Sequence, residues 1–324
     1  MRVALEQRFG PLAEWRSPRG LFTGLAALGL AVLVVLALTT DRFLTVENIK
    51  AILSSASIVG IMALGLTFIT LIGSLVSLAI AATAVMGAMV FLAELHLGLV
   101  PALAISMAAG AAVTALQGLI IGAWGANPVI LTIGAGFLLS GITTKASGGV
   151  IVQPAGGGYA TLNSTPLGVP LGVYVMVVLA LILQFVLKRT VLGRRVTLIG
   201  ENREAARAAG MRIPRITAIA FAIAGASFAL GGAFLGAFNK GASAQLEGTA
   251  TFDVIAAVLV GGTLISGGRG SALRTLAGAI VIATISDLLL LRGFNTGAQI
   301  LLKGVLVVVV VLATWVASRR EGTA

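Results

Sequence analysis

The chain has 324 residues, of which 58% are hydrophobic and 10% are charged, and its mean hydropathy is +1.07. A soluble domain of this size could not bury so much apolar surface, so the composition predicts an all-α, polytopic integral membrane protein. The net charge of +11 does not indicate nucleic-acid binding, because the basic residues collect at the ends of apolar runs and in one loop. The sequence contains no cysteine, which excludes disulfides and thiolate metal sites.

The predicted elements are apolar runs of about 20 residues, the length that crosses a bilayer. Residues 1–20 form an arginine-rich segment, and the run after them lacks a small-residue cleavage site, so it is interpreted as a retained first span. The uncharged run from Ile52 to Leu92 is too long for one span and is expected to break near residues 73–77. We expect about ten spans, at residues 21–39, two within 52–92, 99–123, 127–144, 169–187, 215–238, 252–265, 271–291 and 297–317.

The basic residues set the direction of these spans. The N-terminal arginines, the loop at 188–214 and Arg319-Arg320 belong on the cytoplasmic side by the positive-inside rule. An even number of predicted spans separates each of these segments from the next, so one scheme satisfies all three. Eight spans plus re-entrant segments satisfy the same parity. The scheme gives a cytoplasmic N-terminal segment at 1–20, a transmembrane domain at 21–317, an outer loop at 145–167 and a cytoplasmic tail at 318–324.

The residues that an enzyme needs are missing from the sequence. The chain contains no Gly-Lys dipeptide and therefore no P-loop, so the glycine-rich run at 264–270 is interpreted as a turn between spans. The single histidine, His96, stands at a span end, and no metal-binding motif accompanies it. An intramembrane hydrolase would have to use this histidine. We therefore expect no catalysis, and no metal or cofactor bound by this chain.

A charged island separates the sixth and seventh predicted spans. Residues 188–215 hold eight basic and two acidic residues, whereas residues 21–187 hold six charged residues in all. Within the island, Asn202 can cap a helix, the alanines at 205, 206, 208 and 209 favour it, and Gly210 can end it. A helix of about two turns is marginal alone and has to dock on something. A groove on a cytoplasmic partner and an anionic lipid surface both fit.

Two stretches of the chain resemble a known family. Residues 190–211, TVLGRRVTLIGENREAARAAGM, resemble the cytoplasmic coupling loop of bacterial ABC importer permeases of the ribose/xylose/galactose type. Residues 252–271, FDVIAAVLVGGTLISGGRGS, resemble a characteristic run of the same family. Weaker similarity at 63–69 and 127–134 extends the match to about residues 45–317.

The resemblance implies a function that no single motif would give. It implies a permease subunit of the bacterial inner membrane that pairs with an identical or paralogous permease and passes a sugar or sugar-like solute. A separate cytoplasmic ABC ATPase, which binds ATP and Mg, would drive it, and a periplasmic or lipid-anchored solute-binding protein would feed it. An ATP-independent carrier or channel for a small polar solute is the alternative.

Three sets of candidate residues follow from the resemblance and the topology. The family's coupling helix corresponds to residues 201–210 and gives Glu201, Asn202, Arg203, Glu204, Ala205, Ala206, Arg207 and Gly210. Polar groups on otherwise apolar spans are candidates for the substrate pathway, namely Thr67, Thr70, Ser74, Ser77, Gln117, Asn127, Thr132 and Ser140. Charges on the predicted outer side are candidates for docking the binding protein, namely Arg42, Lys145, Lys240, Glu247 and Arg292.

One departure from the family affects the solute. The turn at residues 73–77, GSLVS, lacks the acidic residue that the family commonly has there. The departure fits either an unusual ligand or a non-identical partner permease that keeps the acid.

Overall fold

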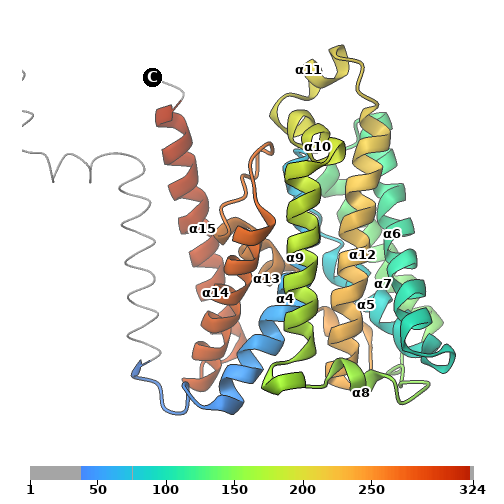
Figure 1. Cartoon of the computed structure of the whole chain (residues 1–324), viewed down its shortest axis with the longest axis vertical. Helices are drawn as coiled ribbons and strands as arrows, with labels where there is room; N and C mark the ends of the chain where they lie inside the picture. The colour runs from blue at the N-terminus through green and yellow to red at the C-terminus, as the bar shows by residue number, and fades with distance from the viewer. Residues whose placement is uncertain (1–37, 75, 322–324) are drawn as a thin grey trace, which may run out of the picture. The chain divides into compact units, whose positions relative to one another are not determined.

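The computed structural model describes residues 38–74 and 76–321, and every regular element in those ranges is helical (Figure 1). The chain divides into two units, one of residues 50–284 and a smaller one that contains residues before 50 and after 284. The helices are α4 (Val46–Leu71), α5 (Ile80–Ala93), α6 (Leu99–Trp124), α7 (Pro128–Ala146), α8 (Tyr159–Leu162), α9 (Leu171–Arg189), α10 (Val191–Glu201), α11 (Arg203–Ala208), α12 (Ile213–Asn239), α13 (Ala250–Val260), α14 (Ala272–Leu291) and α15 (Thr296–Glu321).

The lengths of these helices confirm a polytopic membrane protein. Among the described residues, seven helices are long and apolar enough to cross a bilayer: α4, α5 with the 3₁₀ turn Glu94–Leu97, α6, α7, α9, α12 and α14. Helix α15 has 26 residues and is apolar over Thr296–Val309. The first predicted span lies outside the described residues. The count of ten and the cytoplasmic placement of both termini therefore stay predictions.

Non-helical backbone interrupts two of the predicted apolar runs, 52–92 and 252–265. We call these two runs the interrupted crossings. The expected break near residues 73–77 is confirmed, because α4 ends at Leu71 and α5 begins at Ile80. The expected span at 252–265 is wrong in its extent, since α13 has 11 residues and rises about 16 Å, half the thickness of a bilayer core. The chain leaves this helix at Gly261, and Gly262 takes a φ of +74° that other residues rarely adopt.

Small residues bring the central helices of the larger unit close together. Helix α12 packs along α6 and α5, and a Cβ added at Gly225 would overlap the carbonyl oxygen of Gly110 on α6. At the same contact, the hydroxyl of Thr114 donates a hydrogen bond to the carbonyl of Phe221 at 2.7 Å. Close packing of small residues with hydroxyl-to-carbonyl bonds is the usual way in which membrane helices associate. This contact provides the scaffold on which the interrupted crossings are held.

Candidate functional site

The charged island folds into two consecutive helices at one end of the larger unit (Figure 1). The predicted cap and stop are confirmed: Asn202 Oδ1 accepts from the amide of Ala205 at 2.9 Å, and Gly210 follows α11 with a φ of +74°. Helix α10, which precedes α11, was not predicted. Its signals are the Thr190 cap, whose Oγ1 accepts from Gly193 N at 3.2 Å, and the buried pair Val196 and Ile199.

The eight predicted coupling residues divide between two faces of this segment. Ala206 is 4% exposed and packs against its own chain, so the alanine surface is smaller than the sequence suggested. Arg203 is also turned inward, and its Nη2 donates to the carbonyls of Ile121 at 3.1 Å and Gly122 at 3.3 Å. Burial, and then the nearby Arg207, lower the pKa of Arg203. The exposed members of the set are Glu201, Asn202, Glu204, Ala205, Arg207 and Gly210.

The segment joins α4 at the point where the first crossing breaks. A Cβ added at Gly200, at the end of α10, would overlap the carbonyl oxygen of Leu71, the last residue of α4. The same carbonyl accepts a hydrogen bond from the amide of Gly268 at 2.9 Å. The α-carbon of Gly73 lies 2.7 Å from the position that a Cβ of Gly267 would occupy. The island, the first interruption and the loop before α14 therefore form one contact, which we call the glycine junction.

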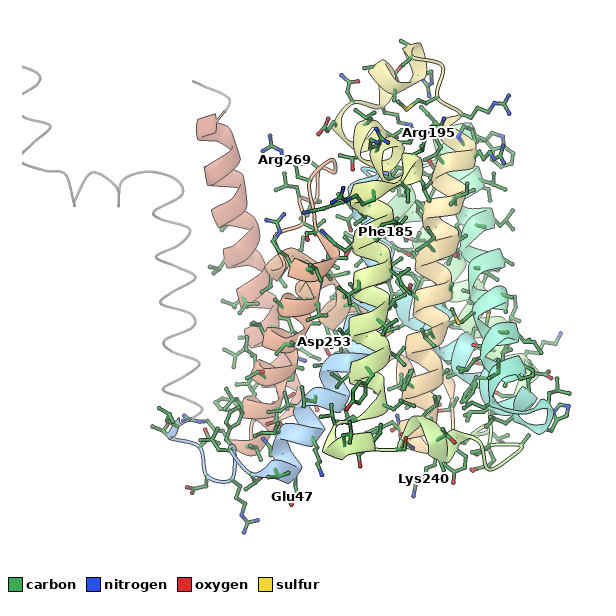
Figure 2. All side chains as sticks on the ribbon, viewed as in Figure 1. Glu47, Phe185, Arg195, Lys240, Asp253 and Arg269 are labelled. Atoms are coloured by element: carbon green, nitrogen blue, oxygen red, sulfur yellow. The ribbon has the colours of Figure 1, made fainter. Side chains whose placement is uncertain are left out.

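Charged residues lie at both ends of the larger unit (Figure 2). Figure 2 shows Arg195 and Arg269 at the end that carries α10 and α11, with Lys240 at the opposite end. Lys145 and Lys240 are exposed, whereas nothing is described of the side chain of Glu247. In the smaller unit, Arg42 is exposed and Arg292 donates to the hydroxyls of Thr39 at 2.6 Å and Thr40 at 2.9 Å. The five outer candidates are thus surface charges wherever their side chains are described.

Within the larger unit, the two interrupted crossings meet. The amide of Ala81, in the first turn of α5, donates to Thr251 Oγ1 in the first turn of α13 at 3.2 Å. The amide of Leu78, in the interruption itself, donates to Thr132 Oγ1 of α7 at 3.1 Å. Two short helices thus begin beside one another, and helix N-termini carry partial positive charge. Together these residues form the strongest candidate for a solute pathway.

The sequence did not point to two residues of this meeting point, Thr251 and Asp253. Figure 2 shows Asp253 between the level of Lys240 and that of Arg269. It lies in the first turn of α13, which begins at Ala250 after a largely non-helical segment. The hydroxyl of Thr249 donates to Asp253 Oδ2 at 3.0 Å, which positions the carboxylate in the first turn of α13.

The structure places four of the predicted pathway residues at the interruption or in α4, the helix before it. Ser74 and Ser77 lie buried in the interruption, and Ser77 Oγ accepts from the amide of Ala79 at 3.3 Å. Thr132 holds the interruption from α7, as described. Thr67 lies buried in α4, where its hydroxyl lies 2.9 Å from that of Thr275 on α14. The first three can therefore contribute to one site, whereas Thr67 bonds within α4 and to α14.

The other four predicted pathway residues are placed elsewhere. Thr70 bonds to the carbonyl of Leu66 in its own helix, Asn127 is exposed and caps α7, and Ser140 is half-buried in the middle of that helix. Gln117 is 4% exposed in α6, and neither end of its amide has a hydrogen-bond partner among the described residues. Within the same residues, no cluster of three or more histidines and carboxylates could hold a metal.

Comparison with known proteins gives a consistent result. A family described as "Branched-chain amino acid transport system / permease component" matches residues 48–313. The ribose import permease protein RbsC of Bacillus subtilis is 31% identical over 88% of this chain and 90% of its own length. The L-arabinose ABC transporter permease protein AraH of Azospirillum brasilense is 26% identical over 90% and 86%.

A third relative matches a shorter region more strongly. The probable ABC transporter permease protein YphD of Escherichia coli is 41% identical over 49% of this chain and 48% of its own length. No solved structure matches the chain.

Proposed function

The chain belongs to the family of branched-chain amino acid transport system permease components, and on that premise we propose that it forms, with a second permease chain, the membrane pathway of an ATP-binding-cassette importer for a sugar-like solute. It is the membrane-spanning component and not the ATPase, and it is a multi-pass protein of the bacterial inner membrane. ATP and Mg would bind to the partner ATPase.

The observation that carries the proposal is the glycine junction. There the island, the end of α4 and the loop before α14 approach within backbone contact, so a displacement of α10 cannot leave the first interruption unmoved. Arg203 adds a second link, from α11 to the end of α6. A force applied to the exposed face of α11 would therefore reach both an interrupted crossing and the scaffold helix.

The exposed part of α11 is suited to contact the ATPase. Ala205, Ala208 and Ala209 present small side chains outward, and Glu204 and Arg207 form an exposed ion pair at 3.0 Å. A helix of six residues that keeps one face on its own chain can offer the other to a groove on an ATPase. We therefore assign the exposed face of α11 to the ATPase and the opposite end of the larger unit to the solute-binding protein.

The solute is assigned by relatives and by chemistry. The relatives that match nearly the whole chain are named for ribose and L-arabinose. The meeting point of the interrupted crossings offers hydroxyls and one carboxylate, Asp253, which suit a polyhydroxylated neutral solute that both donates and accepts hydrogen bonds. The description of the family names branched-chain amino acids, so leucine is the comparison solute.

The proposal is tested on the importer purified from its native host in mild detergent. We expect an ABC ATPase to co-purify with the wild-type chain and to be lost with the double variant Ala205→Trp/Ala208→Trp. The matched control is Ala160→Trp, an exposed alanine in α8 at the opposite end. In proteoliposomes containing the binding protein, uptake of ribose or arabinose, not leucine, should require ATP. Solute uptake without ATP, or an ATPase that stays bound to the double variant, would contradict the proposal.

A further inference from the structure

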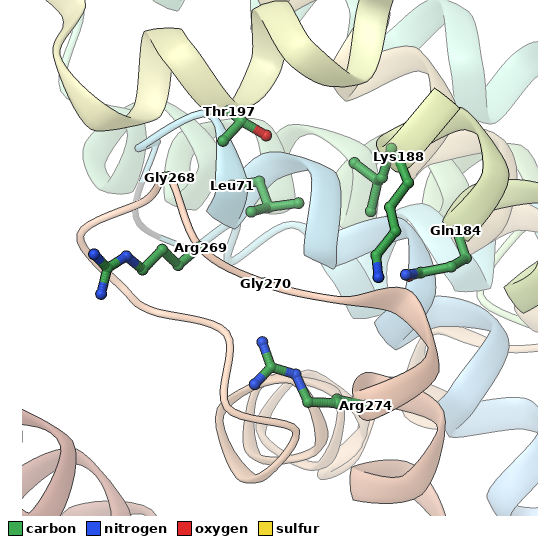
Figure 3. A pocket seen from close by; sticks show the side chains of 9 residues that line it. Leu71, Gln184, Lys188, Thr197, Gly268, Arg269, Gly270 and Arg274 are labelled. Carbon is green, nitrogen blue, oxygen red and sulfur yellow. The ribbon is translucent and has the colours of Figure 1, made fainter. Parts of the chain in front are cut away.

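A cavity of about 310 Å³ opens beside the glycine junction (Figure 3). Its walls come from the last turn of α9, from α10, from the end of α4 and from the loop that leads into α14. All of these segments belong to the larger unit. The cavity lies at the end of the larger unit that carries α10 and α11, away from the meeting point of the interrupted crossings. It is therefore distinct from the proposed solute pathway.

The cavity is lined by three cationic side chains and by no acidic one. Lys188 comes from α9, Arg269 from the loop and Arg274 from α14. Figure 3 shows Lys188 and Arg274 directed into the space from different walls, with Arg269 along its outer rim. Neither Lys188 nor Arg274 is in an ion pair within the described part of the chain. Cations that converge on one space repel one another unless an anion joins them.

A buried amide fixes the spacing of two of these cations. Gln184 of α9 is 9% exposed, and its Oε1 accepts from the amide of Ala272 at 2.9 Å and from the hydroxyl of Ser271 at 3.1 Å. This pair of bonds ties the start of α14, and hence Arg274, to the helix that carries Lys188. Because Oε1 is occupied by donors, the Nε2 end of the same amide is left to donate, and Gln184 itself lines the cavity.

We propose that this cavity binds a phosphate group. Ammonium, guanidinium and amide donors with no acceptor among them match phosphate oxygens. Leu71 and Leu187 supply an apolar wall for the body that carries the phosphate. The hydroxyl of Thr197 also lines the space, but it donates to the carbonyl of Gly193 in its own helix at 3.1 Å. Two sources share this chemistry: the headgroup of an anionic phospholipid, and a soluble phosphorylated small molecule of the cytoplasm.

Occupation of the cavity has a mechanical consequence. A bound phosphate would connect α9 and α14 across the space whose remaining walls are α10 and the end of α4. Those two elements meet at the glycine junction, so the ligand would restrain the segment through which the ATPase acts. This consequence rests on the proposed function, whereas the binding itself does not depend on it.

The test measures binding to the purified full chain in nanodiscs. Pure phosphatidylcholine discs are dialysed against radiolabelled inorganic phosphate and glucose 6-phosphate. Discs of equal parts phosphatidylcholine and phosphatidylglycerol are analysed by native mass spectrometry for retained phosphatidylglycerol. We expect Lys188→Gln and Arg274→Gln each to weaken binding about tenfold, equivalent to about 1.4 kcal/mol. Lys188→Arg, which keeps the charge, should bind like wild type.

The control is Arg189→Gln, which removes an exposed cation next to Lys188 that does not line the cavity. Saturable phosphate binding in neutral discs identifies a soluble ligand, and retained phosphatidylglycerol without phosphate binding identifies a lipid headgroup. Either result supports the proposal if the control is unaffected. Absence of both kinds of binding, or an equal loss in Arg189→Gln, would overturn it. No ATPase or solute is present, so failure here is independent of the importer assignment.

Discussion

The guanidinium of Arg203 donates from Nη2 to the carbonyl of Ile121 at 3.1 Å, which links the first residue of α11 to the last turn of α6. The terminal carbonyls of a helix lack partners within that helix, and a cation at a helix C-terminus also interacts favourably with the helix dipole. Arg203 thus completes a membrane helix from within the charged island. This link is specific, because Arg207 on the same helix is exposed and pairs with Glu204 instead.

Arg203→Gln is expected to separate ATP hydrolysis from transport. Hydrogen bonds to charged groups contribute about 1.5–3 kcal/mol, and we take the lower end because this guanidinium is only partly buried. Transport per ATP hydrolysed should fall about tenfold, while the ATPase stays bound. The measurement is simultaneous solute uptake and phosphate release in proteoliposomes. Arg207→Gln, the matched control, should change this ratio less than twofold.

The same link should not respond to pH in the physiological range. Burial lowers the pKa of Arg203, so the folded state disfavours its charged form and the linked stability would rise with pH. An arginine pKa starts far above neutrality, however, so this rise lies outside the range from about pH 6 to 9. Transport per ATP should therefore have the same dependence on pH in the wild type and in Arg203→Gln over this range. A titration that disappears in the variant would contradict the assignment.

Gly200→Ala should damage the glycine junction. The added methyl group would overlap the carbonyl oxygen of Leu71, and a backbone atom cannot move aside as a flexible side chain can. Overpacking of this kind costs about 1–3 kcal/mol. We expect a lower melting temperature in detergent and less transport per ATP. Gly134→Ala provides the control, since a Cβ at Gly134 in α7 would meet nothing within 4 Å and should leave both measurements unchanged.

Local features of the sequence predicted the parts of this fold that have local causes. The cap at Asn202, the stop at Gly210 and the break after Leu71 each rest on residues within a few positions, and each is confirmed. Helix α10 was missed because the stretch was interpreted as a loop from its charge. Its signal is the helical spacing of two apolar residues, Val196 and Ile199, among these charges. Most of the described apolar spans begin and end within a few residues of the prediction, because one physical rule, burial in lipid, sets their length. The run at 252–265 is the exception.

The candidate site was predicted less completely, because it depends on contacts between distant segments. Thr251 bonds to Ala81 across 170 positions, and Asp253 lies beside this contact because α13 begins only at Ala250. Asn127 looked like a polar group in a pathway, but it is a helix cap at the surface. The sequence identifies the polar residues in apolar runs, but only their contacts in the fold show whether they pack, cap a helix or line a pathway.

Thr251→Val should loosen the meeting of the two interrupted crossings. The substitution keeps the shape of the side chain but removes the acceptor for the amide of Ala81, and a buried amide without a partner costs about 1–3 kcal/mol. Thermal unfolding should show this loss of stability, and uptake should fall with it. Thr251→Ser keeps the hydroxyl and should behave like wild type in both measurements. If valine and serine have equal effects, the hydrogen bond does not hold the crossings together.

Gln117→Leu should affect stability and transport differently. Both ends of the Gln117 amide are buried without a hydrogen-bond partner among the described residues, which is unfavourable for folding. Leucine of similar size removes that cost, so the melting temperature should stay the same or rise. If the amide contributes to the solute pathway, KM for solute uptake should rise several-fold while ATP hydrolysis is unchanged.

The outcome distinguishes a pathway residue from a packing residue. Ser106, on the same buried face of α6, donates to the carbonyl of Gly87 at 2.8 Å, so Ser106→Ala removes an established packing bond and provides the control. We expect Ser106→Ala to lower the melting temperature with little change in KM, the reverse of the pattern for Gln117→Leu. A melting temperature that falls in Gln117→Leu would mean that its amide has a partner in the assembled importer, and the second permease chain would be the first place to look for it.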